Sequence, residues 1–215
     1  MKTDFGTRSS LKLAAAIGLA LFSVNYASPV YALPTNGKVT AGDAGIDTSG
    51  KTMNIDQKTG KVAIDWKSFD IDKGETVNFR QPGTDSIALN RVLGNDASKI
   101  YGNLNANGQV FLINPNGVLF GQGAQVDVGG LVASTRDIDT QAFMNATDTY
   151  QFSGSSDAKV INAGEIKAQG GVVALLAKQV DNQGTIVTVD GATALAAGDS
   201  RLRWAAQGRP VRLWA

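Results

Sequence analysis

The sequence predicts an all-β protein of the parallel β-helix class. From Leu33 onward, short runs rich in Val, Ile and Phe are separated by Gly, Asn, Asp and Ser, and few stretches keep a helical period. One strand-forming segment also repeats itself with a period of twenty residues, which is typical of solenoids. Leucine-rich repeats share this period, but they need several leucines per turn, and this chain has too few. A parallel β-helix therefore fits both observations better.

The clearest strands are predicted at residues 61–66, 75–79, 109–113 and 117–120. Helix is considered at only two places, residues 96–101 and residues 136–146, where DIDTQAFMNA follows a strand-like run. A β-helix has open ends, and an exposed terminal turn invites edge-to-edge aggregation, so capping elements are expected. The polar, irregular residues 33–60 are the predicted N-terminal cap.

The repeat begins at Val160. Residues 160–177 and 180–197 share eight identities over eighteen positions without a gap: Val160/Val180, Asn162/Asn182, Gly164/Gly184, Ile166/Ile186, Gly171/Gly191, Ala174/Ala194, Leu175/Leu195 and Ala177/Ala197. In successive turns of a β-helix, identical residues lie above one another. We therefore expect Ile166 over Ile186 and Leu175 over Leu195 to build an inward apolar column. Asn162 over Asn182 should form a hydrogen-bonded ladder at a bend.

A further turn is predicted upstream of the repeat. Residues 129–133, GGLVA, resemble residues 170–174, GGVVA. If both segments occupy the same place in their turns, residues 137–158 must loop out of the solenoid between them.

The first 32 residues are predicted to be a Sec-type signal peptide. Lys2, Arg8 and Lys12 precede the apolar stretch LAAAIGLALFSV at residues 13–24, and VYA at residues 30–32 is a small-residue cleavage site. Cleavage is expected after Ala32, with Ala27 as the alternative. A membrane anchor is the competing interpretation, but about a dozen apolar residues is short for a span. The Sec machinery is therefore an expected partner, and the mature chain is expected to leave the cytoplasm.

The composition excludes several classes of function. The 215 residues include no cysteine and no histidine, which removes disulfides, thiolate chemistry, histidine-dependent nucleophiles and the commonest zinc ligand. Residues 1–32 hold three basic residues and one acid, so their removal lowers the net charge from +1 to −1. The last fifteen residues hold four arginines and no acid, which leaves residues 33–200 at −5. This acidic body has no basic stripe for phosphates, so no nucleic acid partner is expected.

Residues 201–215, RLRWAAQGRPVRLWA, depart from the repeat before a further turn is complete. One interpretation is a basic interaction tail. The broken repeat favours a second interpretation, in which a frameshift or truncation ends the reading frame of a longer solenoid. The chain is thus divided into a signal peptide at 1–32, a domain at 33–200 and an atypical tail at 201–215.

Two loose groups of carboxylates raise the question of enzymatic activity, because some β-helix proteins cleave polysaccharides. They are Asp65, Asp70 and Asp72, and Asp127, Asp137 and Asp139. Neither group has calcium-loop spacing, and the repeats lack the nonapeptide of calcium-binding β-rolls. We therefore expect solvated acids, no metal or other cofactor, and no enzymatic activity. A β-helix protein that binds or cleaves carbohydrate is the alternative.

Several ordered motifs resemble a known family. They are LPT at residues 33–35, GETVNF at 74–79, IALNRV at 87–92, ANGQVFLINPNGVLFG at 106–121 and VGGLVAST at 128–135. In this order they resemble the N-terminal secretion domain of the filamentous haemagglutinin family (the haemagglutination activity domain), which is the exported partner of two-partner secretion (TPS) systems. The resemblance covers about residues 33–200.

The resemblance implies a right-handed, single-stranded parallel β-helix with an N-terminal cap and extra-helical β-strands. It also implies export to the periplasm and recognition there by a dedicated outer-membrane β-barrel transporter with POTRA domains, which leaves the protein secreted or at the cell surface. Members of the family are large adhesins, haemolysins or contact-dependent toxins whose activity lies C-terminal to this domain. A host or cell-surface receptor is therefore expected only for a C-terminal region missing from this chain.

The motif Asn114-Pro115-Asn116-Gly117 is the leading candidate site. Proline presets φ, Asn114 can bond the backbone two residues on, and Gly117 accepts a positive φ, so the motif predicts a tight turn between stacked strands. The resemblance implies that this motif is linked to secretion competence. It does so either as a surface on which the transporter docks or as a turn needed for folding.

Asn90, in the motif IALNRV, carries the same two interpretations, with a buried asparagine that satisfies backbone groups as the favoured one. Its neighbour Arg91 is expected to be solvated. The apolar residues that flank the motif, at 111–113 and 118–120, are expected to lie in the core. If some of them stay exposed at a strand edge, they offer a place for β-augmentation by a transporter strand.

Overall fold

The computed structural model describes residues 32–147 and 149–198, together with the backbone of residues 201–205 and 212–214. The predicted signal peptide lies outside the described residues except for Ala32. The side chains of the predicted tail also lie outside them.

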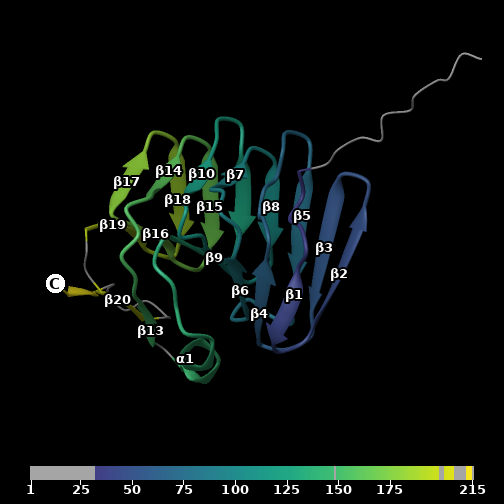
Figure 1. The fold of residues 1–215 in the computed structure, drawn as a ribbon, viewed down its shortest axis with the longest axis horizontal. Helices are drawn as coiled ribbons and strands as arrows, with labels where there is room; N and C mark the ends of the chain where they lie inside the picture. Colours follow the sequence, from purple (N-terminus) through teal and green to yellow (C-terminus); the bar gives the residue numbers. More distant parts are fainter. Residues whose placement is uncertain (1–31, 148, 199–200, 206–211, 215) are drawn as a thin grey trace, which may run out of the picture. The chain divides into compact units, whose positions relative to one another are not determined.

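The described chain forms a parallel β-helix, as predicted, in which successive turns add strands to three faces (Figure 1). The first face contains β4 (Lys61–Trp66), β6 (Ile87–Val92), β9 (Gln109–Ile113), β12 (Gly130–Ser134), β16 (Val173–Ala177) and β19 (Thr193–Ala197). The second face contains β7 (Ser98–Ile100), β10 (Val118–Phe120), β14 (Lys159–Asn162) and β17 (Gln179–Asn182). The third face contains β3 (Thr52–Gln57), β5 (Thr76–Arg80), β8 (Asn103–Ala106), β11 (Gln125–Val128), β15 (Glu165–Gln169) and β18 (Thr185–Val189). Neighbouring strands of a face come from successive turns, so each turn makes its ladder hydrogen bonds with the turns on either side.

Two antiparallel strands close the N-terminal end of the stack. β1 (Lys38–Ala41) pairs with β4, and β2 (Ala44–Ser49) pairs with β3. The predicted cap is confirmed for these two strands. β3 runs parallel to β5 and already belongs to the first turn, so the cap is shorter than residues 33–60. Because β1 and β2 have mostly exposed or half-exposed side chains, they cover the first turn with a polar edge.

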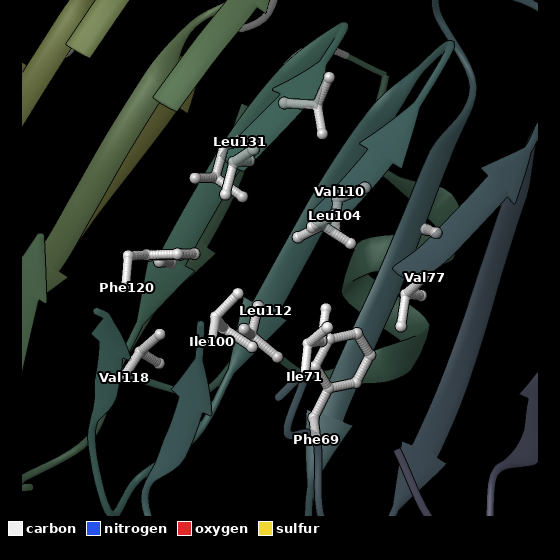
Figure 2. Packing of buried hydrophobic residues seen from close by; sticks show 14 of the residues in the cluster. Phe69, Ile71, Val77, Ile100, Leu104, Val110, Leu112, Val118, Phe120 and Leu131 are labelled. Atoms are coloured by element: carbon white, nitrogen blue, oxygen red, sulfur yellow. The ribbon is translucent and has the colours of Figure 1, made fainter. Parts of the chain in front are cut away.

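Inward side chains from all three faces fill the interior. Figure 2 shows Ile100, Leu104 and Leu112, which come from the three strands of one turn, in the interior between the faces. Ile71 and Phe120 occupy the positions equivalent to Ile100 in the turns before and after it. All five side chains are fully buried, and each contributes about 1.5–3 kcal/mol relative to an exposed position. The resulting apolar columns hold neighbouring turns in register.

The twenty-residue repeat corresponds to two successive turns. Ile166 pairs with Ile186 and Leu175 pairs with Leu195, as predicted. The predicted asparagine ladder is also confirmed, because Asn162 Nδ2 donates a hydrogen bond of 2.8 Å to Asn182 Oδ1. The repeat therefore reports the register of the stack directly.

Two predictions about this region need correction. Residues 129–133 do form another turn, but Leu131 pairs with Val173 rather than with Val172. The register shifts by one residue because the backbone of Gly171 lies against the carbonyl of Gly129. Leu195 takes its predicted place above Leu175, yet its side chain is 48% exposed because no described turn stacks on it.

Residues 137–158 leave the solenoid between β12 and β14, as predicted, and form a lateral flap against the first face (Figure 1). The flap contains α1 (Thr140–Asn145), within the predicted 136–146, and β13 (Thr149–Phe152). Backbone pairing joins β13 to β20 (Arg201–Ala205), and β20 to β21 (Arg212–Trp214). In the described part of the chain, no helix has the length and hydropathy to cross a membrane.

An aromatic cluster and one lysine hold the flap in place. Phe143, Tyr150 and Phe152 of the flap pack with Phe111 of β9, at ring-centroid distances of 5.2 to 6.0 Å. Lys61 Nζ donates hydrogen bonds to the carbonyl oxygens of Phe143 and Ala146 at the end of α1. It also lies 5.4 Å and 5.1 Å from the ring centroids of Phe143 and Tyr150. Burial lowers the pKa of Lys61.

The helix considered at residues 96–101 is wrong. Residues 98–100 form β7, whose three residues pair in parallel with Val118, Leu119 and Phe120 of β10. Ser98 and Ile100 point inward and are buried, while Lys99 between them is exposed. Pairing with the neighbouring turn outweighs the weak local helical preference.

Candidate functional site

The motif at residues 114–117 forms the corner between β9 and β10, and Asn114 is its buried anchor. Its side chain is fully buried. Asn114 Nδ2 donates to the carbonyl oxygen of Asp96 and to Ser98 Oγ, both at 3.0 Å, which ties the corner to the preceding turn. Asn114 Oδ1 accepts from the backbone N–H of Asn116 at 2.9 Å, the bond that defines an Asx turn. Asn114 therefore shapes the corner from inside and presents no surface to a partner.

Pro115 and Asn116 are the exposed residues of the corner. Asn116 Nδ2 donates to the carbonyl oxygen of Gly94 in the preceding turn at 2.8 Å and to Asn114 Oδ1 at 3.2 Å. The carbonyl oxygen of Pro115 accepts a hydrogen bond from Ser156 Oγ in the returning segment of the flap. These bonds hold both exposed residues in one orientation from the turn below and from the flap above.

Gly117 is required by both conformation and space. Its φ is +113°, a backbone region that other residues rarely adopt. A Cβ at this position would also lie 3.0 Å from the carbonyl oxygen of Lys159 in the next turn. The glycine therefore allows the chain to turn into β10 directly beneath β14.

Asn90 is a fully buried residue of β6 on the inner side of the first face. Its Oδ1 accepts from Trp66 Nε1 at 3.0 Å, and its Nδ2 donates to the carbonyl oxygens of Ala88 at 3.2 Å and Phe111 at 3.4 Å. Asn90 thus satisfies polar groups of three successive turns within the core. The structure does not bring Asn90 and the exposed part of the corner together on one surface.

Arg91 was expected to be solvated, and this expectation is wrong. Its side chain is only 14% exposed and lies between Asp65 of β4 and Asp137 of the flap, at 3.4 Å and 2.9 Å. It also donates to Thr140 Oγ1 at 3.0 Å and to the carbonyl oxygen of Ile138. The flap folds over the outer side of β6, which places an outward-pointing arginine at an interface instead of in water.

The remaining carboxylates of the two groups have separate structural surroundings. Asp139 caps α1 by accepting from the backbone N–H of Ala142 at 2.8 Å, and Asp72 Oδ1 accepts from that of Lys73 at 2.7 Å. Asp70 accepts from the backbone N–H of Lys99 at 2.7 Å, and burial raises its pKa. Asp127 is exposed on β11. Within the described ranges, no three His, Cys, Asp or Glu residues gather as a metal site would require.

Sequence reasoning missed one residue beside the corner. Leu93 follows β6 directly and is 62% exposed, although it is a large apolar side chain. It precedes Gly94, whose carbonyl oxygen accepts the hydrogen bond from Asn116. In the sequence, a leucine directly after a strand only marks the end of that strand. The stacking of turns reveals that Leu93 is next in sequence to the residue that Asn116 contacts. Leu93, Pro115 and Asn116 together are called the corner surface below.

The chain matches a known family and two curated relatives. The TPS secretion domain family matches residues 30–212. Two heme/hemopexin-binding proteins of Haemophilus influenzae are 41% identical over 174 residues and 42% identical over 133 residues, which cover 77% and 61% of this chain. The matched regions make up only 19% and 14% of those relatives, so this chain spans a small part of their length.

Two solved structures share the fold. The HMW1 secretion domain from Haemophilus influenzae is 32% identical, with a TM-score of 0.74, and the match covers 84% of this chain and 48% of that one. The filamentous hemagglutinin secretion domain has a TM-score of 0.61 at 16% identity, over 85% of this chain and 68% of that one, and this likeness supports the fold alone. The chain therefore belongs to the TPS secretion domain family.

Proposed function

We propose that this domain is recognised in the periplasm by its cognate outer-membrane transporter, through the transporter's POTRA domains, after Sec export and cleavage at Ala32. The corner surface is the recognition element in this proposal. Family membership supports a secretion-targeting role. Recognition through Leu93, Pro115 and Asn116 is the part that needs testing.

The observation that supports this proposal most is the division of labour within the motif. Asn114 and Gly117 are buried and fix the corner, whereas Pro115 and Asn116 are exposed and held rigidly. Leu93, which directly precedes the Gly94 that Asn116 contacts, adds an exposed apolar side chain. A rigid surface loses little conformational entropy when a partner binds, which favours recognition.

The matched Heme/hemopexin-binding protein is named for what it binds, but the matched part is 19% of it. We propose that the present domain supplies export, and that any adhesive, haemolytic, toxic or heme-directed activity belongs to other parts of such proteins. Binding of a host or cell-surface receptor is likewise assigned to a region other than residues 33–200. This assignment agrees with a domain whose carboxylates serve caps, turns and ion pairs.

Secretion of the domain with and without its transporter tests the proposal. The chain is expressed in a host that lacks any two-partner transporter, either alone or with the cognate transporter. We expect periplasmic accumulation of the chain alone and appearance in the medium when the transporter is present. Equal amounts in the medium under both conditions would contradict transporter-dependent export.

The corner variants then separate contact from folding. Leu93→Ser and Pro115→Ser remove exposed apolar groups without removing a side-chain hydrogen bond, and Asn95→Ala, an exposed residue of the preceding turn, is the control. We expect the first two to stay folded and to bind the purified periplasmic region of the transporter more weakly. Pro115→Ser should also lose about 0.4–1 kcal/mol of stability, because proline no longer presets φ in the turn. If both variants bound as tightly as the native protein, the corner surface would not be the recognition site. The family membership of the chain would be unaffected by that result.

A further inference from the structure

A hollow of about 530 Å³ lies away from the corner surface, where the second face bends into the third face. It is lined by Asp72, Lys73, Tyr101, Gln122 and Gly123. These residues come from three successive turns of the solenoid. The corner surface and the turn at residues 114–117 contribute no residue to this lining.

The lengths of three stacked connections explain the hollow. Residues 72–75 and 121–124 are four-residue β-turns, closed by hydrogen bonds from Glu75 N to Asp72 O at 2.9 Å and from Ala124 N to Gly121 O at 3.0 Å. Residues 101–102, which lie between them in the stack, form a connection of two residues. The short connection is therefore recessed between two longer turns.

The two flanking turns have matching geometry. Their third residues, Gly74 and Gly123, have φ values of +79° and +90°, as a type II turn requires. Lys73 and Gln122 therefore occupy the same second position in the two turns. Their side chains border the hollow from opposite sides, one turn below and one turn above Tyr101.

Tyr101 forms the floor. Its ring packs against Gly121 of the next turn, where a Cβ would lie 2.1 Å from Tyr101 Cε1. The tyrosine nevertheless keeps 37% of its surface exposed, and that surface lines the hollow. Gly121 thus makes room for an aromatic ring that is supported on one side and accessible on the other.

The polar rim has unused hydrogen-bonding capacity. Asp72 uses one carboxylate oxygen to accept from the backbone N–H of Lys73, and its second oxygen has no partner among the described residues. The Lys73 ammonium and the Gln122 side-chain amide likewise form no hydrogen bond or ion pair with the described residues. A carboxylate, an ammonium and an amide therefore surround one aromatic ring, and the two charges cancel.

We propose that this hollow binds a neutral saccharide. A pyranose ring offers a C–H face that packs on an aromatic ring, and hydroxyl groups at its edge that both donate and accept hydrogen bonds. Asp72 accepts from those hydroxyls, Lys73 donates to them, and Gln122 does both. The volume falls in the range of small-molecule sites, and a charged or amide side chain stands on each side of Tyr101.

Saturation-transfer NMR with three probes tests this site: methyl β-D-glucopyranoside, methyl β-D-galactopyranoside and N-acetyl-D-glucosamine. We expect transfer to at least one probe. Tyr101→Ala should weaken binding about tenfold because stacking is lost, and Tyr101→Phe should stay within about threefold of the native protein. Gln122→Ala should fall between these two variants.

Gln183→Ala is the matched control, because Gln183 occupies the place of Tyr101 in the terminal turn of the same column. We expect it to leave binding unchanged. The proposal is overturned if no probe receives saturation, or if Tyr101→Ala and Gln183→Ala bind equally well. Comparable urea unfolding midpoints for Tyr101→Ala and Tyr101→Phe show that weaker binding reflects the ring and not the fold.

Discussion

The two repeated turns at residues 160–177 and 180–197 share eight residues and one register, but they differ in burial. Leu175 is fully buried, whereas its partner Leu195 is 48% exposed. Ile166 is likewise fully buried, and Ile186 above it is only partly so. The two turns are alike in sequence, and the difference is that another described turn covers only the first. Burial in this solenoid therefore comes from the next turn along the stack.

The largest expected effect of this difference is on the leucine pair. Leu175→Ala should lower the free energy of unfolding by about 2–5 kcal/mol, because it opens a cavity between covered turns. Leu195→Ala should cost less than about 1 kcal/mol, because much of that side chain is already in water. Urea unfolding of the two variants measures both values. Equal losses would mean that the terminal turn is covered as fully as the turn before it.

The asparagine ladder should show the same contrast with a smaller effect. Asn162 accepts from Gly164 N at 3.1 Å and donates to Asn182 Oδ1 at 2.8 Å, all within a buried bend, while Asn182 is exposed. Asn162→Ala should cost about 1–3 kcal/mol because it leaves a buried N–H without a partner. Asn182→Ala should cost less than about 1 kcal/mol. If the exposed asparagine proved the more costly one to remove, the ladder would not be held by its buried member.

A partly buried carboxylate and an exposed carboxylate should also differ in how their contributions to stability depend on pH. Burial raises the pKa of Asp70, whereas the hydrogen bond from Lys178 lowers the pKa of the exposed Asp157. For Asp70 the folded protein holds its proton more tightly, so the free energy of unfolding falls as pH rises from the ordinary value of 3.8 through the raised value. For Asp157 the sign is opposite, and stability is lost as pH falls through its lowered pKa.

Asp70→Asn should therefore remove the contribution of this group to any decline in stability as pH rises above its ordinary pKa of 3.8. Asp157→Asn should flatten the loss of stability at lower pH. Urea midpoints of the native protein and the two variants across this range measure both effects. A steeper decline in Asp70→Asn than in the native protein would contradict the assigned sign.

The smallest expected effect on stability comes from the outer side of the terminal turn. Val187 and Val189 are 41% and 51% exposed, and they lie beside Lys167 and Gln169 of the covered turn. Replacing them with the polar residues of that turn, Val187→Lys and Val189→Gln, should change stability by less than about 0.5 kcal/mol and reduce self-association. Sedimentation at increasing protein concentration measures this. Identical concentration dependence in the double variant and the native protein would show that the valines attract no second molecule.

Much of the fold could be predicted because the period of the repeat sets the register of the stack. In the last two described turns, each strand residue of the repeat pairs with the residue twenty positions further along the chain. The twenty-residue shift predicts Ile166 under Ile186 and Asn162 under Asn182, and both pairs are found in the stack. Contacts between the stacked turns and the flap could not be predicted, because the flap does not share the repeat. The sequence places Arg91 on the outer side of a strand, and only the flap that folds over it brings it into an ion pair with Asp137.

The candidate site followed the same pattern. The turn at residues 114–117 could be predicted from its proline, its glycine and the side chain of Asn114. The burial of Asn114 and the proximity of Leu93 depend on how consecutive turns stack, and no local pattern encodes that. The hollow at Tyr101 arises because a short connection lies between two longer ones in the stack. The sequence gives the three lengths, but only the structure gives their order in the stack.

The corner surface differs from the terminal turn because it is supported on both sides. The preceding turn holds it from below, and the flap holds it from above. The most direct test of the account is the affinity of two folded asparagine variants for the periplasmic region of the cognate transporter. Asn114→Ser should lose stability because a buried anchor is removed, and its folded fraction should bind as the native protein does. Asn116→Ser should keep most of its stability and bind at least about tenfold more weakly. If folded Asn116→Ser bound as tightly as the native protein while folded Asn114→Ser did not, recognition would not occur at the exposed corner.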